Sequence, residues 1–584
     1  MALNFVYEPA KKSVLSRIAA ALNYFFCIIG VFVCLIAAFA LWHKEAPLSF
    51  KENTALRLSF DTDLYEDRPS DLAGALTFGN PPTVADVVLG LNRAAKDPKI
   101  TALVGYLPSL DLSLAQIQEI RDAIIAFGET GKRTVVFAPS FGEMGGGLGA
   151  YYLASAFKEI HMQPTGEVGV AGVSVESPYF RKALEKIGVH PSFGARYEYK
   201  TGADSLTAEK MSVAERENLK ELIDGFLTQA AADIGKARAI PAERMKKILT
   251  DGPYFADTTL NMRLVDKTGY IDALEDEVRE QYADMADFFD YAYATEPRPS
   301  AKDDVFALIP AIGTIQTGDS VFGGGAYASV LGTATFSGNL RDAADDETVK
   351  AIIVRLDSPG GGYIPSDTMW RELNYVKSVK NKPVVCSIAS MAASGGYFIS
   401  LGCDAVFAEP SAITGSIGVF GGKMVFKNLL AKLDIAVSSV NVGKNAGLIS
   451  PAADFTPEQR KFFEQSLDRV YADFTAKVAE RRGFDAKKLD KIARGRVFTG
   501  AQAVENGLID GIGGLTQALE KAAELSGVKV PLPLIEYPIQ PTRFEMLSDF
   551  LMSGKLKTTG IVPKFKSLLK RDFRVFFDGF SVEK

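Results

Sequence analysis

Short apolar runs alternate with helical stretches along most of this chain, from about residue 55 to residue 530. Residues 351–356 and 382–388 are short and mostly apolar, as buried strands are, and residues 366–376 between them have helix-like spacing. Strands that alternate with helices predict βαβ units, in which neighbouring strands are parallel. The pattern therefore predicts an α/β protein.

A different pattern marks the N-terminus. Residues 18–42 carry no charge and are rich in Phe, Ile, Ala, Val and Leu, over a length that can span a bilayer. Positive charge is in excess before this segment, so we expect a cytoplasmic N-terminus at 1–17 and the rest of the chain outside the cytoplasm. A cleaved signal peptide is the alternative. Because the run is long for a signal peptide, we expect a retained anchor.

The chain contains an internal repeat. Residues 148–173 match residues 394–419 without a gap, and a second match at a similar spacing joins 263–266 to 507–510. The repeat predicts two copies of one α/β unit, a linker between them and a C-terminal tail. The expected boundaries are 55–293 for the first copy, 294–304 for the linker, 305–530 for the second copy and 531–584 for the tail.

Ser394 lies at the point where the predicted strand 382–388 should turn into a helix. Two alanines precede it and two glycines follow it, so no neighbouring side chain blocks its hydroxyl. The free amides and the dipole of the following helix could stabilise an oxyanion at this turn. Tight packing of small residues between a helix and a sheet is the alternative interpretation.

Two further turns in the same copy support a site. A strand-like run ends in Ser-Pro-Gly-Gly at 358–361, and Thr-Gly-Ser at 414–416 is a third strand end with a hydroxyl. The first copy has Leu148 where the second has Ser394, and Leu-Pro-Ser-Leu at 107–110 where the second has the glycine turn. The first copy has therefore lost the predicted nucleophile.

The composition narrows the chemistry. The chain has three histidines, and none lies in the copy that carries Ser394, which argues against a Ser-His-Asp triad without excluding a histidine from the first copy. A lysine with a lowered pKa is the more plausible base. The four cysteines have no metal-binding spacing, so we expect no metal and no cofactor. A net charge of −6 gives no indication of a nucleic-acid partner.

Taken together, these motifs resemble those of the long, duplicated (67K-type) members of the signal peptide peptidase A family, serine peptidase family S49. The resemblance covers nearly the whole chain. It depends on Ser-Pro-Gly-Gly at 358–361, Met-Ala-Ala-Ser-Gly-Gly-Tyr at 391–397, Thr-Gly-Ser-Ile-Gly-Val at 414–419 and Tyr-Lys at 199–200.

The resemblance implies a crotonase-like fold, shared with Clp protease subunits, in each of the two tandem repeats behind an N-terminal transmembrane helix. It also implies a single-pass protein of the bacterial inner membrane, with its catalytic domains in the periplasm. The implied substrates are signal-peptide remnants and other apolar membrane peptides, and the implied assembly is a homotetramer.

Carried over residue by residue, the resemblance makes Ser394 the nucleophile and Lys200 of the first copy the general base. Ser416 would hold the lysine amine, and the amides of Gly361 and Gly395 would form the oxyanion hole. Lys444 occupies the matching place in the second copy, so either lysine could serve. Because the sequence around 199–203 is more similar to the family motif, we expect Lys200 to be the base and Lys444 to be a surface lysine.

The chain departs from the family in two places. Gly-Tyr follows the glycine turn at 362–363, and Thr-Gly-Ala-Asp-Ser-Leu follows Lys200, which bears on substrate preference. We expect shallow apolar pockets lined by Ile364, Met391 and Phe420.

Two other functions remain open. One is an acyl-CoA enzyme of the crotonase fold, although an exported chain has no supply of CoA. The other is a proteolytically silent scaffold that gathers membrane peptides. The apolar and basic residues of the tail fit a domain cap or, less well, a helix on a membrane surface.

Overall fold

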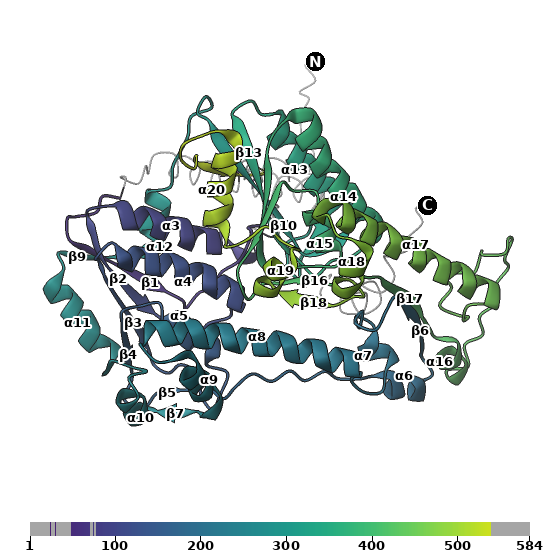
Figure 1. Cartoon of the computed structure of the whole chain (residues 1–584), viewed down its shortest axis with the longest axis horizontal. Helices are drawn as coiled ribbons and strands as arrows, with labels where there is room; N and C mark the ends of the chain where they lie inside the picture. The colour runs from purple at the N-terminus through teal and green to yellow at the C-terminus, as the bar shows by residue number, and fades with distance from the viewer. Residues whose placement is uncertain (1–23, 25–29, 31–47, 70–73, 75–76, 539–584) are drawn as a thin grey trace, which may run out of the picture. The chain divides into compact units, whose positions relative to one another are not determined.

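The computed structural model describes residues 24, 30, 48–69, 74 and 77–538 (Figure 1). It divides into two units, Met1–Ser49 and Phe50–Lys584, and the second unit holds both copies of the repeat. The predicted anchor at 18–42 and the tail beyond residue 538 lie outside the described residues, apart from Tyr24 and Gly30. Within the described part of the chain, no helix has the length and apolar character that crossing a bilayer requires.

The first sheet is parallel and comes from the first copy. Its strand order is β8-β4-β3-β2-β1-β9. Its strands are β1 (Thr54–Ser59), β2 (Ile100–Tyr106), β3 (Arg133–Ala138), β4 (Glu159–Met162), β8 (Lys267–Thr268) and β9 (Asp284–Asp287). Almost every residue of β2 and β3 is buried, which is typical of strands covered on both faces.

The second sheet comes from the second copy and repeats this order, because β15-β14-β13-β10-β20 corresponds to β4-β3-β2-β1-β9. Its strands are β10 (Val305–Ile312), β13 (Val349–Ser358), β14 (Val384–Ala393), β15 (Ala405–Ala408), β16 (Ile413–Gly415), β18 (Val497–Thr499), β19 (Gly511–Ile512) and β20 (Leu534–Glu536). The pair β16–β18 is antiparallel and the other pairs are parallel. The predicted α/β class with parallel sheets is therefore confirmed.

Helices connect the strands in both copies, and several begin at capping boxes that the sequence encodes. Ser113 and Gln116 satisfy each other's backbone amides at the start of α4, as Thr456 and Gln459 do at α17. The helices of the first copy are α3 (Val84–Lys96), α4 (Leu114–Glu129), α5 (Leu148–Ala154), α6 (Arg181–Ile187), α7 (Asp204–Thr207), α8 (Val213–Ala237), α9 (Ala242–Asp251), α10 (Ala256–Asn261), α11 (Ile271–Gln281) and α12 (Phe288–Ala294).

The helices of the second copy follow the same plan. They are α13 (Thr333–Asp345), α14 (Tyr363–Tyr375), α15 (Gly395–Ser400), α16 (Lys427–Lys432), α17 (Pro457–Arg482), α18 (Ala486–Ile492), α19 (Gly500–Asn506) and α20 (Leu515–Ser526), with a π-helical turn at Val376–Lys380. Helix α14 starts three residues before the predicted 366, because Pro365 fits the first turn, where its missing amide is not needed. The second sheet also extends past residue 530, since β20 pairs with β10.

One short pair of strands completes each copy, and a third pair joins the copies. The pairs β5 (Glu167–Val168) with β7 (Tyr254–Phe255) and β11 (Thr314–Gln316) with β12 (Val330–Gly332) each lie within one copy. By contrast, β6 (His190–Ala195) of the first copy pairs antiparallel with β17 (Phe420–Val425) of the second. Helix α8 extends from the first sheet toward this joint pair (Figure 1).

A buried ion-pair cluster also joins the copies. Arg355 of β13 lies 2.8 Å from Glu66 through Nε and 2.6 Å from Glu119 of α4 through Nη2, and all three side chains are at most 4% exposed. Arg355 also donates to the Ser387 hydroxyl, and Glu119 accepts from the Leu515 amide. The guanidinium of one copy thus bridges two carboxylates of the other away from water.

We predict that Arg355→Leu lowers the free energy of unfolding by about 3–5 kcal/mol, because two buried carboxylates lose their partner. Denaturant unfolding followed by circular dichroism measures this change. Arg341→Leu is the control, since Arg341 pairs with Glu372 at 2.7 Å but its side chain is 58% exposed. The control should cost no more than about 1 kcal/mol. Equal losses in the two variants would show that the cluster does not stabilise the contact between copies.

Candidate active site

Ser394 follows the last residue of β14 and precedes α15, as the sequence predicts. Its backbone has φ 54° and ψ −116°, a conformation that side-chain-bearing residues rarely adopt. Its amide donates to the Gly415 carbonyl at 2.9 Å, which fixes the turn to the end of β16. The hydroxyl is thereby presented beyond the end of the sheet, at the N-terminus of a helix.

Lys200 reaches this hydroxyl from the first copy. Its Nζ lies 2.9 Å from Ser394 Oγ, 2.9 Å from Ser416 Oγ and 2.8 Å from the Ser416 carbonyl oxygen. Lys200 is only 5% exposed. Burial lowers the pKa of Lys200 to about 7, because the ammonium form loses its hydration. At neutral pH a substantial fraction of this amine is therefore free to accept a proton.

The segment 494–496 closes the lysine into this position, and the sequence carried no signal for it. The Arg494 carbonyl accepts from the Tyr199 amide, and the Arg496 carbonyl accepts from the Ser416 amide. Gly495 has φ 88°, and a Cβ there would lie 2.4 Å from the Lys200 nitrogen of the backbone, so a side chain at 495 would displace the lysine.

Gly361 and Gly395 lie beside each other next to the nucleophile. A Cβ on Gly395 would lie 3.2 Å from the Gly361 amide nitrogen, and Gly395 is the first residue of α15. Neither amide donates a hydrogen bond to another group in the described part of the chain. Two free amides at the ends of neighbouring strands can hold an oxyanion.

The two candidate lysines differ in position, because Lys200 contacts Ser394 and Lys444 does not. Lys444 is exposed, and its one hydrogen bond among the described residues is from Gln459 to its backbone carbonyl.

Of the residues expected to line apolar pockets, Met391 is half-buried, Phe420 is 38% exposed and Ile364 is 71% exposed. Ile364 therefore faces solvent in this single chain.

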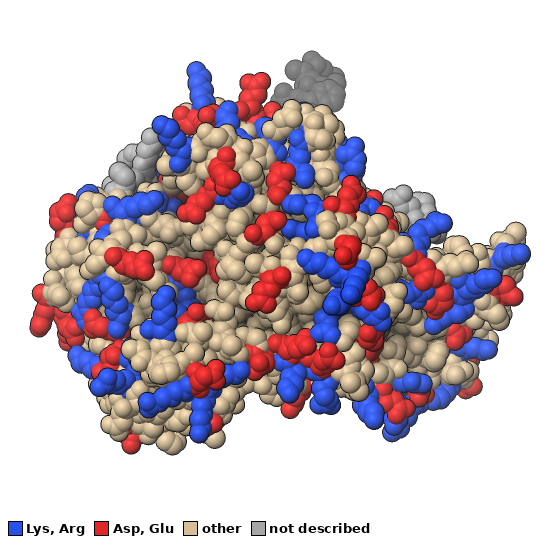
Figure 2. Space-filling view, in the orientation of Figure 1, with Lys and Arg blue, Asp and Glu red and all other residues tan. Residues whose placement is uncertain are grey.

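The two described histidines do not contribute to this site. His161 lies within β4 and His190 pairs with Asp454 at 3.5 Å, so neither contacts Ser394. Across the described residues there is no group of His, Cys, Asp and Glu that could hold a metal ion. On the face shown in Figure 2, basic and acidic side chains are intermixed.

Comparison with known proteins supports a peptidase. The sequence profile of peptidase family S49 matches residues 130–284 and 377–529, one segment in each copy and together more than half of the chain.

Three curated relatives extend the match. Protease 4 of Salmonella typhi is 29% identical over 95% of this chain and 89% of that protein. Protease 4 of Haemophilus influenzae is 30% identical over 75% of this chain and 72% of that protein. The chloroplastic serine protease SPPA of Arabidopsis thaliana is 28% identical over 82% of this chain and 70% of that protein.

A solved structure of a ClpP1 mutant from Listeria monocytogenes aligns with 12% identity over 35% of this chain and 90% of that chain, at a TM-score of 0.21, which carries no weight for the fold. The profile matches both copies, and the relatives span the duplicated chain. The chain therefore belongs to peptidase family S49 and is a serine peptidase.

Proposed function

We propose that this chain is a membrane-anchored serine endopeptidase in which Ser394 attacks the peptide carbonyl and Lys200 is the general base. The observation that carries the proposal is the 2.9 Å approach of a buried, mostly water-excluded lysine amine to the serine hydroxyl. A serine hydroxyl is a weak nucleophile until a nearby base accepts its proton. The neutral Lys200 amine is such a base.

The remaining groups have roles that follow from their positions. Ser416 binds the amine through its hydroxyl and carbonyl and so orients the nitrogen lone pair toward Ser394. The amides of Gly361 and Gly395 stabilise the negative charge that develops on the carbonyl oxygen. The Lys200 ammonium formed in the first step gives its proton to the leaving amine of the substrate. The neutral Lys200 amine then activates the water that hydrolyses the acyl-enzyme.

The proposed substrates are signal-peptide remnants and other apolar peptides of the bacterial inner membrane. This assignment depends on the uncharged segment at 18–42 and on the resemblance to the signal peptide peptidase A family, which also implies the crotonase-like fold of each repeat. The segment would cross the membrane once, with the catalytic copies in the periplasm. A proteolytically silent scaffold is the weaker alternative, because a scaffold does not require a buried lysine amine next to a serine with a strained backbone.

We predict that Ser394→Ala and Lys200→Met each lower kcat on an apolar peptide by about 10³-fold or more. Lys444→Met should stay within about twofold of wild type, because this lysine is exposed. A fluorophosphonate probe should label wild type and fail to label Ser394→Ala. The melting temperature of Lys200→Met should not fall, because a lysine whose pKa is lowered in the folded state destabilises that state at neutral pH.

The same assay tests the substrate class. Peptides with Leu, Ala or Phe at the cut site should have higher kcat/KM than matched peptides with Lys or Glu. Equal values would contradict apolar membrane peptides as substrates. In the test of the two lysines, an inactive Lys444→Met variant together with an active Lys200→Met variant would show that the second copy carries both the nucleophile and the base.

The pH profile should follow the titration of Lys200. A base with a pKa of about 7 is protonated and inactive below that pH, so kcat/KM should rise about tenfold from pH 6 to pH 8 and then level off. Burial also raises the pKa of Asp357 to about 7, so the rise must be shown to persist in Asp357→Asn. A flat profile in wild type, with chemistry rate-limiting, would exclude a lysine base.

A homotetramer is the proposed assembly, and the joint pair β6–β17 supports it. At the repeat spacing of 246 residues, β17 corresponds to residues 174–179 and β6 to residues 436–441. Neither segment belongs to a strand, and most of their residues are exposed, including Val175 and Val440. Pairing of residues 436–441 of one protomer with residues 174–179 of another protomer would repeat the β6–β17 contact around a closed ring.

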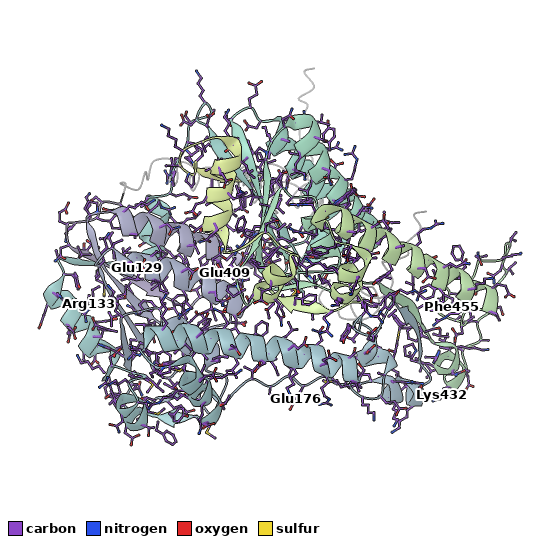
Figure 3. The ribbon with its side chains drawn as sticks, in the orientation of Figure 1. Glu129, Arg133, Glu176, Glu409, Lys432 and Phe455 are labelled. Atoms are coloured by element: carbon purple, nitrogen blue, oxygen red, sulfur yellow. The ribbon has the colours of Figure 1, made fainter. Side chains whose placement is uncertain are left out.

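These two segments lie at different parts of the second unit. Glu176 lies below α8, whereas Lys432, Phe455 and the neighbouring α16 lie beyond β17 (Figure 3). A segment and its partner site that are separate on one protomer make head-to-tail contacts, which close into a ring or continue as a filament.

We predict that Val440→Asp dissociates the assembly, because Val440 is 96% exposed in the single chain and would be covered by the partner strand. Light scattering of the detergent-solubilised full chain measures the mass. Val530→Asp is the control, since Val530 is 65% exposed and lies outside both segments. A monomeric wild type, or a Val440→Asp protein of unchanged mass, would contradict this assembly.

A further inference from the structure

Strand β14 changes both its register and its neighbour just before the nucleophile. Against β13, Leu356 pairs with Ile388 but Ser358 pairs with Ala392, so residues 389–391 bulge opposite one residue, Asp357. On its other edge β14 pairs with β15 up to Ile388 and with β16 from residue 391 onward. Such bulges bend a strand and redirect the side chains that follow.

The carboxylate of Asp357 holds this bulge. Its Oδ1 accepts from the Met391 amide at 3.0 Å and also from the Ser390 hydroxyl. Asp357 is only 4% exposed. The bulge takes the Met391 amide out of the regular ladder with β13, and a buried amide needs another acceptor. Asp357 provides that acceptor from within the neighbouring strand.

The residues that follow the bulge, 392–394, are hydrogen-bonded to residues 414–415, which precede the lysine-binding Ser416. The Ala392 carbonyl accepts from the Thr414 hydroxyl at 2.8 Å. The Ser394 amide donates to the Gly415 carbonyl at 2.9 Å, and the next residue, Ser416, binds the Lys200 amine. A shift of the bulge would therefore move Ser394 relative to both Ser416 and Lys200.

The first copy provides an internal comparison. There β2 and β3 pair without any shift from Ala102 to Tyr106. The registers of β1–β2 and β10–β13 match Tyr106 with Arg355, so this ladder ends before the position of the bulge. The same copy has Leu148 in the place of the nucleophile. Among the described residues, the extension of this strand pair to a bulge held by a carboxylate thus occurs in the copy that has the serine.

We propose that Asp357 is a positioning residue, whose carboxylate oxygen accepts from the 390–391 segment and so fixes the bulge that aims Ser394 at Lys200. The proposal rests on the proposed function of Ser394 as nucleophile. It requires an acceptor of this length at 357. An asparagine keeps that acceptor, an alanine removes it, and a glutamate keeps the charge but displaces the oxygen by one methylene.

The test compares Asp357→Ala, Asp357→Asn and Asp357→Glu in the full-length protein, with activity expressed per site titrated by the fluorophosphonate probe. Asp357→Ala and Asp357→Glu should lower kcat and the probe-labelling rate by about tenfold to 10²-fold, because small displacements of reacting groups have effects of this size. KM should stay within about twofold. Asp357→Asn should keep kcat within about threefold of wild type.

Asp346→Ala is the matched control. Asp346 precedes the other end of β13 and likewise accepts from a backbone amide and a hydroxyl, both of Thr348, at 2.9 and 2.6 Å. Its removal should leave kcat per titrated site unchanged, whatever it does to stability. Loss of a structural residue lowers the number of active sites, whereas loss of a positioning residue lowers the rate at each site.

Wild-type kcat in Asp357→Ala overturns the proposal, and so does an Asn variant as slow as the Ala variant. Should the alanine variant not fold, Asp357→Glu decides, because wild-type kcat in that variant shows that the position of the acceptor does not matter. The outcome is separable from the proposed function. Residual activity in Ser394→Ala refutes the nucleophile, whereas a normal Asp357→Ala beside an inactive Ser394→Ala refutes only the positioning role.

Discussion

The removal of the Lys200 amine from water is the constraint on which the rest of the structure depends. An exposed lysine is an ammonium ion at neutral pH and cannot accept a proton from a serine. Lys200 is buried, and its pKa falls to about 7. The three oxygen contacts from Ser394 and Ser416 satisfy the nitrogen without adding negative charge that would raise that pKa again. Neutral partners around a buried amine are what a lysine base requires.

Burial of this amine depends on how the two copies contact each other, because Lys200 and Ser394 come from different copies. Paired groups of opposite copies surround the contact. Asn218 of α8 exchanges two hydrogen bonds with the backbone of Val497, and Arg355 binds the carboxylates of Glu66 and Glu119. An apolar interface can slide at small cost, whereas reciprocal hydrogen bonds and buried charges are satisfied in one arrangement. These contacts therefore set the distance between base and nucleophile.

The sequence predicted the parts of this site that depend on local pattern. Alternating strands and helices gave the α/β class, and the small residues around Ser394 gave the turn at the end of β14. The repeat, with the family resemblance, directed attention to Lys200 over Lys444, and the structure brings the first of these to Ser394. The catalytic roles themselves stay predictions.

Contacts between distant residues could not be predicted in this way. Arg355 and Glu66 are 289 residues apart, and neither carries a motif. The need for a glycine at 495 could not be predicted either, because it depends on the Lys200 backbone, which lies against this residue only in the folded chain. The two-residue shift between β13 and β14 leaves no trace in hydrophobic periodicity, because residues 384–393 read as one continuous small and apolar run.

The comparison of the copies shows where unfavourable conformations are kept. Ser394 and Ser416 both have positive φ, at 54° and 52°, and the bulge beside Asp357 interrupts a parallel ladder. In the first copy Leu148 is the first residue of α5 and is not among the residues with positive φ. Residues held in such conformations cost free energy and persist only where the surrounding contacts enforce them. Positive φ also occurs in the first copy, at Met144 (58°) and at Tyr197 (67°), three residues before Lys200, so both copies hold unfavourable backbone conformations close to the groups that they contribute to the site.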